Sequence, residues 1–257
     1  MEKPSIQIQN LFKSFGSKQV LRGITLDVYP GQVLGYIGPN GAGKSTTVKI
    51  LCGLLSDYSG TVLVQGHNVT LDPLEAKKRI GYIPEMAELY DVLTPTEFLH
   101  FMGELYGMDP DVCAQRIVRI MTAFGMQANL HQRLDTFSKG MRQKVLLASG
   151  LLHNPDIIIL DEPLSGLDAN SVILVKELIS KLAKDGKTIF YCSHMMDIVE
   201  KVSHRIILID NGVILADGSF EQLKQQQGDR SLEQIFATLT SKDAHSTAAD
   251  ELMRAFE

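Results

Sequence analysis

The chain has 257 residues, of which 44% are hydrophobic and 21% are charged, and its formal net charge is −5. This is the composition of an ordinary globular protein, and the length is sufficient for a substantial core in one compact unit. The acidic balance excludes non-specific binding to nucleic acid through bulk positive charge, so no nucleic-acid partner is expected.

The sequence predicts neither a membrane span nor a secretory signal. No apolar run approaches the roughly 18–20 residues that cross a bilayer, and the opening MEKPSIQIQN lacks a basic flank followed by an apolar stretch. The three cysteines, Cys52, Cys113 and Cys192, are far apart and form no CxxC pair. We expect them to be buried and unpaired in a reducing cytoplasm, where the protein would reach a membrane only through a partner.

The first third of the chain alternates apolar and polar residues as β-strands do. IQIQNLF (6–12) and VLRGITLDVYP (20–30) show this alternation, and QVLGYIG (32–38) is a short apolar run. A glycine-rich loop follows, and KSTTVKILCGLL (44–55) predicts a helix. A strand, a glycine-rich loop and a helix in this order form a phosphate-binding unit.

A mainly helical insert is predicted at about residues 90–152. Its first helix begins with a cap at Thr94, with Pro95 at the first position and Glu97 three residues after the cap. A second helix follows Asp109 and Pro110. The residues expected to face inward are Phe98, Phe101, Met102 and Leu105 on the first helix, and Val112, Cys113, Ile117, Ile120, Met121 and Phe124 on the second.

Strands return after the insert as DIIIL (156–160), TIFYCS (188–193) and RIILID (205–210), with the helix VILVKELISKLA (172–183) between the first two. This alternation predicts a parallel sheet with helices packed against it. Asn211 and Gly212 predict a hairpin after the last of these strands. The expected fold class is therefore α/β, with a P-loop NTPase core, an N-terminal antiparallel β-subdomain and a helical subdomain insert.

The glycine-rich loop has the spacing of a phosphate loop, from Gly38 through Gly43 to Lys44 and Ser45. Successive backbone N–H groups would form a nest for a β-phosphate, and the following helix adds its positive end. Lys44 would reach the β- and γ-phosphates, and Ser45 would bind Mg²⁺. The alternative is a fortuitous loop, which the preceding strand and following helix disfavour. The remaining predicted nucleotide-binding residues of the loop are Pro39, Asn40, Gly41, Ala42 and Thr46.

Two carboxylates follow a predicted buried strand in IIILDEP (157–163). Open parallel sheets bind ligands at the C-terminal ends of their strands, so Asp161 is placed to hold Mg²⁺ directly or through water. Glu162 is the candidate to orient and polarise the attacking water. Alone, this pair would more often be a helix cap or a solvated turn. Beside a complete phosphate loop, the catalytic interpretation is favoured.

Three further segments, FSKGMRQ (137–143), SGLD (165–168) and CSH (192–194), occur in an order that resembles the ATP-binding subunit of an ABC transporter. The resemblance covers about residues 5–217. It implies one ABC-type ATPase domain, assigned here to residues 1–240. The C-terminal tail, 241–257, is polar and alanine-rich and is expected to be a short helix or disordered. It also implies a head-to-tail dimer, in which each ATP lies between the phosphate loop of one subunit and the signature segment of the other.

The signature segment departs from the family's usual Leu-Ser-Gly-Gly-Gln, because here Phe, Lys and Met replace the first, third and fifth residues. Ser138 and Gly140 match the family. Ser138 would cap a helix whose positive end faces the γ-phosphate, and Gly140 would let the backbone approach closely. The alternative is a plain serine-capped helix with Arg142 and Lys144 in solvent.

Four more positions take roles from the resemblance. Asp168 corresponds to the residue that couples the two ATP sites, although it could also be a helix N-cap. His194 corresponds to the histidine that contacts the γ-phosphate and the attacking water. Phe15, five residues before Val20, corresponds to the aromatic residue that stacks on adenine, the alternative being a phenylalanine of the core.

Glu85 occupies a position where most of the family has glutamine. An anionic oxygen there would bind Mg²⁺ more tightly than a neutral carbonyl. The alternative is that Glu85 points to solvent or caps the next helix.

The resemblance implies an ATP-hydrolysing subunit that is peripheral on the inner face of the cell membrane and powers an integral-membrane permease. A second ATPase subunit, identical or different, would complete the dimer. Export is favoured over import, because SLEQIFATLT (231–240), IGYIPE and SKGMRQK resemble the ATP subunits of two-component bacterial exporters. The alternative is a soluble ABC-class ATPase in cluster assembly or another non-transport role.

Overall fold

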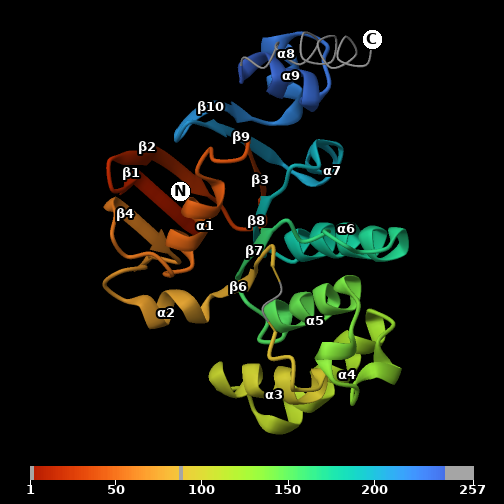
Figure 1. The fold of residues 1–257 in the computed structure, drawn as a ribbon. Helices are drawn as coiled ribbons and strands as arrows, with labels where there is room; N and C mark the ends of the chain where they lie inside the picture. The colour runs from red at the N-terminus through yellow and green to blue at the C-terminus, as the bar shows by residue number, and fades with distance from the viewer. Residues whose placement is uncertain (1–2, 87–88, 241–257) are drawn as a thin grey trace, which may run out of the picture.

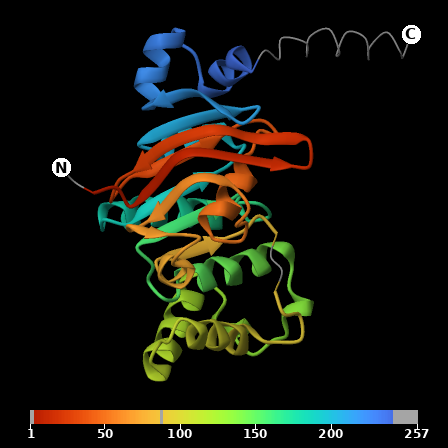
Figure 2. The ribbon, with the colours of Figure 1, turned by 90° about the vertical axis from the view of Figure 1, so that its left-hand side faces the viewer.

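The computed structural model describes residues 3–86 and 89–240 of the chain. An antiparallel four-stranded sheet forms one side of the molecule, on the left in Figure 1 and toward the viewer in Figure 2. Its strands alternate buried and exposed residues because one face packs on the core. Their order is β2 (Lys18–Val28), β1 (Ile6–Phe15), β4 (Ser59–Val64) and β5 (His67–Asn68).

A six-stranded sheet runs through the centre of the molecule (Figure 1). Five neighbouring strands are parallel, and the edge strand β10 is antiparallel to β9. All residues of β3, β7 and β8 are buried, which explains their continuous apolar sequences. The order is β10 (Val213–Gly218), β9 (Arg205–Asp210), β3 (Val33–Ile37), β8 (Thr188–Cys192), β7 (Ile157–Asp161) and β6 (Ile80–Ile83).

The helices lie in separate groups around this sheet (Figure 1). On the N-terminal side are α1 (Lys44–Leu51) and α2 (Pro73–Lys78). The segment before β7 contains α3 (Pro95–Leu105), α4 (Pro110–Ala123), the short 3₁₀ turns Gln127–Asn129 and Leu134–Thr136, and α5 (Lys139–Leu151). The remaining helices are α6 (Ala169–Lys184), α7 (Met196–Val202), α8 (Phe220–Gln227) and α9 (Leu232–Leu239).

The central sheet separates two hydrophobic cores. Leu34 and Tyr36 of β3 point into a core shared with the antiparallel sheet and α1. Val33 and Ile37 of the same strand point into the second core, which helices α3 to α9 cover. This alternation follows from the two-residue period of a strand.

The predicted fold class is confirmed, because a parallel α/β core, an antiparallel sheet and the helices α3 to α5 are all present. The capping box at Thr94 and the hairpin at Asn211 and Gly212 also form as predicted. The domain limit at residue 240 stays a prediction, and the tail, 241–257, lies outside the described residues.

The predicted inward face of the helical segment is partly wrong. Phe101, Leu105 and Val112 are exposed, with 39%, 66% and 46% of their surface accessible. Helix α5 packs against one side each of α3 and α4, so only a narrow apolar stripe is buried, centred on Phe98 and Ile117. Apolar residues outside that stripe remain at the surface.

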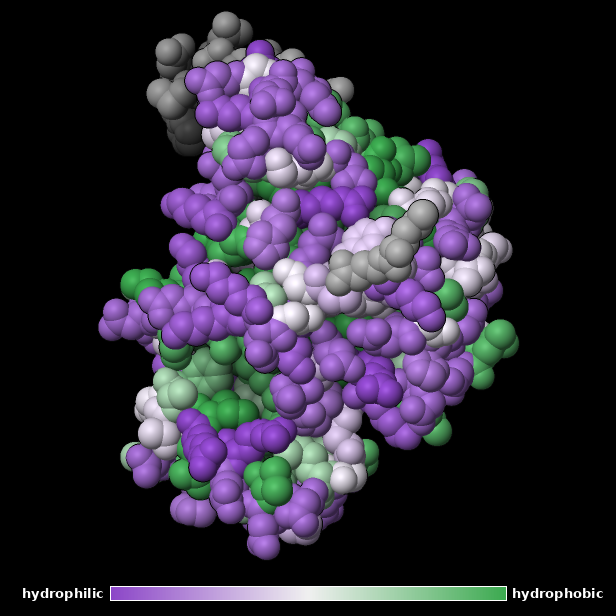
Figure 3. Space-filling view, turned by 180° about the vertical axis from the view of Figure 1, so that it is seen from behind, coloured by the Kyte–Doolittle hydropathy of each residue, from purple (hydrophilic) through white to green (hydrophobic). Residues whose placement is uncertain are grey.

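The surface seen from behind is mainly hydrophilic (Figure 3). Hydrophobic side chains gather there in a hollow of about 200 Å³ that residues of α4, α5, β7 and α6 line. Within residues 3–86 and 89–240, no helix has the length and apolar character needed to span a membrane. The three cysteines are buried and free, as predicted.

Candidate functional site: a phosphate loop and a carboxylate cluster

The predicted phosphate loop connects β3 to α1 at the C-terminal edge of the central sheet. Gly41 and Gly43 have φ values of 82° and 112°, which glycine adopts without strain. Among the described residues, no side chain caps α1, so its first N–H groups face the loop. Lys44 folds over the loop, and its Nζ donates hydrogen bonds to the carbonyls of Gly38 (2.7 Å) and Pro39 (3.1 Å).

The hairpin between β9 and β10 supports this loop, a contact that the sequence did not predict. The backbone N–H of Gly212 donates to the carbonyl of Ala42 (3.0 Å), and the carbonyl of Gly212 accepts from the N–H of Arg22 (2.9 Å). A Cβ atom at Gly212 would lie 2.2 Å from the carbonyl oxygen of Val20. The hairpin therefore joins the loop to β2, and only glycine fits at the junction.

A cleft of about 430 Å³ opens beside the loop. Ser45, Glu85 and Asp161 line it together, although they come from α1, the segment after β6 and the end of β7. Glu85 is exposed, and Thr94 rather than Glu85 caps the next helix. The structure thus brings together the three residues predicted to hold a metal and removes the helix-cap alternative for Glu85.

Asp161 is buried at the end of β7, with 6% of its surface accessible, so it is not part of a solvated turn. Burial first, and then the neighbouring charges of Glu162 and Glu85, raise the pKa of its carboxyl to about 6, against the opposing effect of Lys44 and Lys49. Three carboxylates close together repel one another. A divalent cation in this cleft would relieve that repulsion, so the donor set fits Mg²⁺.

Glu162 and His194 lie in direct contact. They are brought together because Asp161 and Cys192, which precede them, pair across adjacent parallel strands. The Glu162 carboxylate accepts from Ser193 Oγ (3.0 Å) and lies 2.8 Å from His194 Nδ1. Glu162 has a nearly buried side chain, 12% exposed, whereas that of His194 is 74% exposed. Ser193, which lies within CSH and which the sequence does not identify as a site residue, holds the second carboxylate oxygen.

The signature segment begins α5, where Ser138 Oγ accepts from the N–H of Met141 (3.3 Å). A Cβ atom at Gly140 would lie 2.6 Å from the carbonyl oxygen of Gly166, so the segment packs closely on the SGLD turn. Lys139 Nζ also donates to Ser165 Oγ on that turn (2.8 Å). Ser138 is therefore a helix cap, which both interpretations predicted, and it is exposed at the surface.

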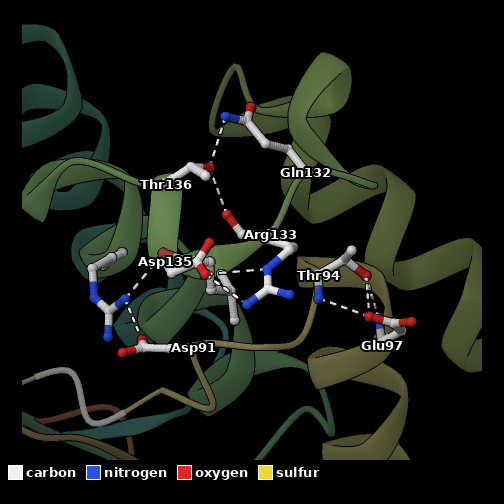
Figure 4. A network of polar contacts seen from close by, with 9 residues as sticks. Asp91, Thr94, Glu97, Gln132, Arg133, Asp135 and Thr136 are labelled. Atoms are coloured by element: carbon white, nitrogen blue, oxygen red, sulfur yellow. Dashed lines mark hydrogen bonds and ion pairs between the residues drawn. The ribbon is translucent and has the colours of Figure 1, made fainter.

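The two basic residues on the first turns of α5 are not simply solvated. Arg142 Nη1 bonds to the carboxylate of Asp91 (2.6 Å) and to the carbonyl of Leu134 (3.0 Å), and Lys144 Nζ lies 3.3 Å from Asp168. Figure 4 shows how polar contacts hold this region, with Asp91 and Thr94 on the segment before α3 and Arg133 and Asp135 on the segment before α5. The segment after Glu85 is thus tied to the signature segment.

Asp168 is the N-cap of α6. Its carboxylate accepts from the N–H (2.9 Å) and the hydroxyl (2.6 Å) of Ser171. These two hydrogen bonds, followed by Lys144, hold the pKa of the Asp168 carboxyl well below its usual range. The helix-cap alternative is therefore correct, and the predicted coupling role remains a prediction alongside it.

Phe15 and Val20 flank the turn between β1 and β2. Phe15 is 49% exposed, which removes the alternative of a core phenylalanine. Val20 lines a second cleft of about 430 Å³ with Asn40, Gly41 and Ala42 of the phosphate loop. Ser138 and Gly140 do not belong to the described residues that line either cleft. One chain thus brings the loop, the carboxylates and His194 together, but not the signature segment.

Comparison with known proteins gives the same assignment. Residues 21–165 match the ABC transporter family. The linearmycin resistance ATP-binding protein LnrL of Bacillus subtilis (strain 168) is 34% identical over 230 residues, which cover 90% of this chain and 74% of LnrL.

Two solved structures share the fold. The ATP-binding subunit of an ABC transporter has a TM-score of 0.87 and 29% identity, covering 91% of this chain and 99% of that one. The ATP-binding cassette MJ0796, solved as a dimer after hydrolysis with ADP and Pi, has a TM-score of 0.76 and 24% identity, covering 83% and 98%. The chain therefore belongs to the ABC transporter family, as an ATP-binding and ATP-hydrolysing subunit.

Proposed function

We propose that this subunit powers export through a separate integral-membrane permease, from a peripheral position on the inner face of the cell membrane. LnrL is named for resistance to linearmycin, and expulsion of a compound is one route to resistance. That relative supports a transport role over the alternative of a soluble ATPase in cluster assembly. The transported compound would contact the permease rather than this chain.

Mg²⁺ would be held by Ser45, Asp161 and Glu85, the oxygen donors that line one cleft beside the loop. When bound, the ion supplies positive charge to the β- and γ-phosphates of ATP. Lys44 would bind the same phosphates after leaving its loop carbonyls, and the free N–H groups of α1 would add further hydrogen bonds.

Glu162 would accept the proton of the attacking water, because its carboxylate is fixed at the edge of the same sheet. Ser193 and His194 hold its two oxygens and set their direction. Phosphoryl transfer requires mainly positioning and charge stabilisation, and a constrained carboxylate supplies the first of these.

The subunit would act as a head-to-tail pair. The observation that carries this proposal is the separation of the site within one chain: the clefts contain residues of the loop together with Glu85 and Asp161, whereas Ser138 and Gly140 line neither. Ser138 lies exposed at the N-terminus of a 13-residue helix, where a phosphate held by a second copy would be stabilised.

Mixing two inactive variants tests this arrangement. Lys44→Ala disables the loop, and Ser138→Glu places a negative charge where the partner's phosphate would lie; each alone should have little ATPase activity. In an equimolar mixture, half of the pairs are mixed and each contains one complete site of two, so about a quarter of wild-type activity should return. No recovery on mixing would contradict the head-to-tail pair while leaving ATP binding by single chains intact.

The membrane partner is tested separately in cells. A tagged copy should copurify with a multi-span protein from detergent-solubilised membranes, and more so when Glu162→Gln slows turnover. Recovery of the tagged chain without any membrane protein would contradict the permease proposal.

A further inference from the structure

Lys13 is a charged residue in an apolar position. It lies on β1 two residues after Leu11 and two before Phe15, and only 6% of its surface is accessible. Lysine is almost never buried to this extent without a partner, because its ammonium loses its hydration. The surroundings of this ammonium therefore identify what the charge contacts.

Two groups surround the Lys13 ammonium. One is Asp57, whose main-chain carbonyl accepts a short hydrogen bond from Nζ and whose carboxylate lies 3.1 Å away. The other is the ring of Phe15, whose centroid is 4.8 Å from Nζ. This is within the distance of a cation–π interaction, which strengthens where the cation is shielded from water.

These contacts link two parts of the nucleotide site. Asp57 belongs to the connection between α1, the helix of the phosphate loop, and β4. Phe15 stands at the end of the β1–β2 hairpin, red in Figure 2, and remains 49% exposed. The ammonium thus lies over the ring, and about half of the surface of Phe15 remains accessible to a ligand.

We propose that Lys13 is a positioning residue for the nucleobase. By holding one face of Phe15, it keeps the opposite face open to stack on adenine, so the ring is ordered before the base arrives. The inference rests on the proposed role of Phe15 as the base platform. Lys13 does not touch the nucleotide in this arrangement; it acts through the ring.

Two substitutions of Lys13 test the effect of its charge separately from that of its hydrogen bond to Asp57. Lys13→Met keeps an unbranched apolar side chain and removes the charge. Lys13→Gln also removes the charge but keeps an N–H donor for the Asp57 carbonyl, so it serves if Lys13→Met fails to fold. The matched control is Lys184→Met, which removes an exposed lysine at the end of α6. Circular dichroism would establish that each variant is folded.

Calorimetric titrations with ATP and with inorganic tripolyphosphate, both with Mg²⁺, give the decisive comparison. Loss of the Lys13 charge should weaken ATP binding by about tenfold, the order expected for a shielded cation–π contact, and leave tripolyphosphate binding within about twofold. In a Phe15→Ala background, the same substitution should have no further effect on ATP. A purely structural role would weaken both ligands together.

The chain contains no tryptophan, which permits a second measurement. A Phe15→Trp variant carries a single indole, whose fluorescence anisotropy reports its mobility. Anisotropy should fall when Lys13 is replaced by Met or Gln and stay unchanged with Lys184→Met.

Unchanged ATP affinity, or equal losses for ATP and tripolyphosphate, would overturn the role of Lys13. Failure of the proposed function is distinguishable, because absence of the permease contact or of the head-to-tail pair would leave ATP and tripolyphosphate binding by the wild-type chain unchanged. If Phe15→Ala binds ATP as the wild type does, the base platform itself is wrong, and the role of Lys13 falls with it.

Discussion

Replacement of Glu162 by glutamine is the most direct test of the catalytic site. The side chain keeps its size, and one amide oxygen can still accept from Ser193, which lies 3.0 Å from the carboxylate. What is lost is the carboxylate's capacity to take a proton and its charge beside His194, 2.8 Å away. Turnover should therefore fall while the site keeps its shape.

The expected loss of turnover follows from the proposed role of Glu162 as a general base. A positioned general base contributes about 10²- to 10⁴-fold to the rate, which corresponds to about 3–5 kcal/mol of transition-state stabilisation. The stability of the fold should not fall as the turnover does, because the charge of Glu162 raises the pKa of Asp161 and so opposes the ionisation of Asp161. Removal of one carboxylate from this cluster relieves repulsion, and ATP binding should be unchanged or slightly tighter.

The assay measures phosphate release and nucleotide affinity on the same preparations. Glu162→Gln should lose at least 100-fold in turnover, with an ATP dissociation constant within a few-fold of wild type. The matched control is Glu177→Gln, which removes an exposed carboxylate on α6 and should have no effect. Wild-type turnover in Glu162→Gln would refute the assignment, whatever its affinity for ATP.

Three further substitutions test other parts of the structure. His153 stacks on Tyr106 with ring centroids 3.6 Å apart, and burial lowers its pKa to about 4. The stability that neutral His153 contributes is complete above pH 6.5 and is lost as the pH falls toward 4. From pH 7 to 5, the free energy of unfolding should therefore fall by about 1 kcal/mol more in the wild type than in His153→Phe, after allowance for partial exposure. Glu85→Gln should raise the Mg²⁺ concentration for half-maximal ATPase activity, and an identical Mg²⁺ dependence would leave Glu85 without a metal role. Gly140→Ala places a Cβ 2.6 Å from the Gly166 carbonyl and should cost about 1–3 kcal/mol in urea unfolding; an unaltered midpoint would show that the turn moves freely.

The sequence located the phosphate loop and the carboxylates because each depends on local order. A glycine loop between a strand and a helix identifies itself through spacing, and Asp161 follows four apolar residues of a buried strand. The CSH segment likewise begins with the last residue of β8. What these segments share is the C-terminal edge of one parallel sheet, so their approach follows once the sheet is predicted.

The strand order could not be predicted in the same way. β3 lies between β8 and β9, more than 150 residues away along the chain, and β7 is its neighbour only through β8. No local pattern records which long-range pairing forms, because each of these strands has an apolar, buried centre that could pair with any of the others. The support of the phosphate loop by the β9–β10 hairpin follows from that order, which is why the contact of Gly212 with Ala42 was missed.

The prediction of which individual side chains are buried failed for two opposite reasons. Leu105 is apolar and fits the helical period, yet it is exposed because α5 covers only one side of α3. Lys13 is charged and would be assigned to solvent, yet it is buried because Asp57 and Phe15 replace its hydration. The deciding neighbour is α5 for Leu105 and Asp57 for Lys13, and each is distant in the sequence. The local pattern of apolar and polar residues therefore cannot predict either outcome.

The backbone at Glu162 shows how the site depends on the completed fold. Glu162 has a φ of 49°, a left-handed conformation that costs a residue with a side chain of order 1 kcal/mol. It is held there because its N–H donates to the carbonyl of Cys192 (2.9 Å) on the adjacent strand, one position beyond the pairing of Asp161 with Cys192. The turn directs the side chain back toward Ser193 and His194 instead of letting it continue along β7. The two adjacent carboxylates consequently reach different partners: Asp161 lines the cleft with Ser45, and Glu162 bonds to the residues that follow β8. The predicted metal ligand and the predicted base can thus occupy consecutive positions, because the neighbouring strand maintains the strained turn between them.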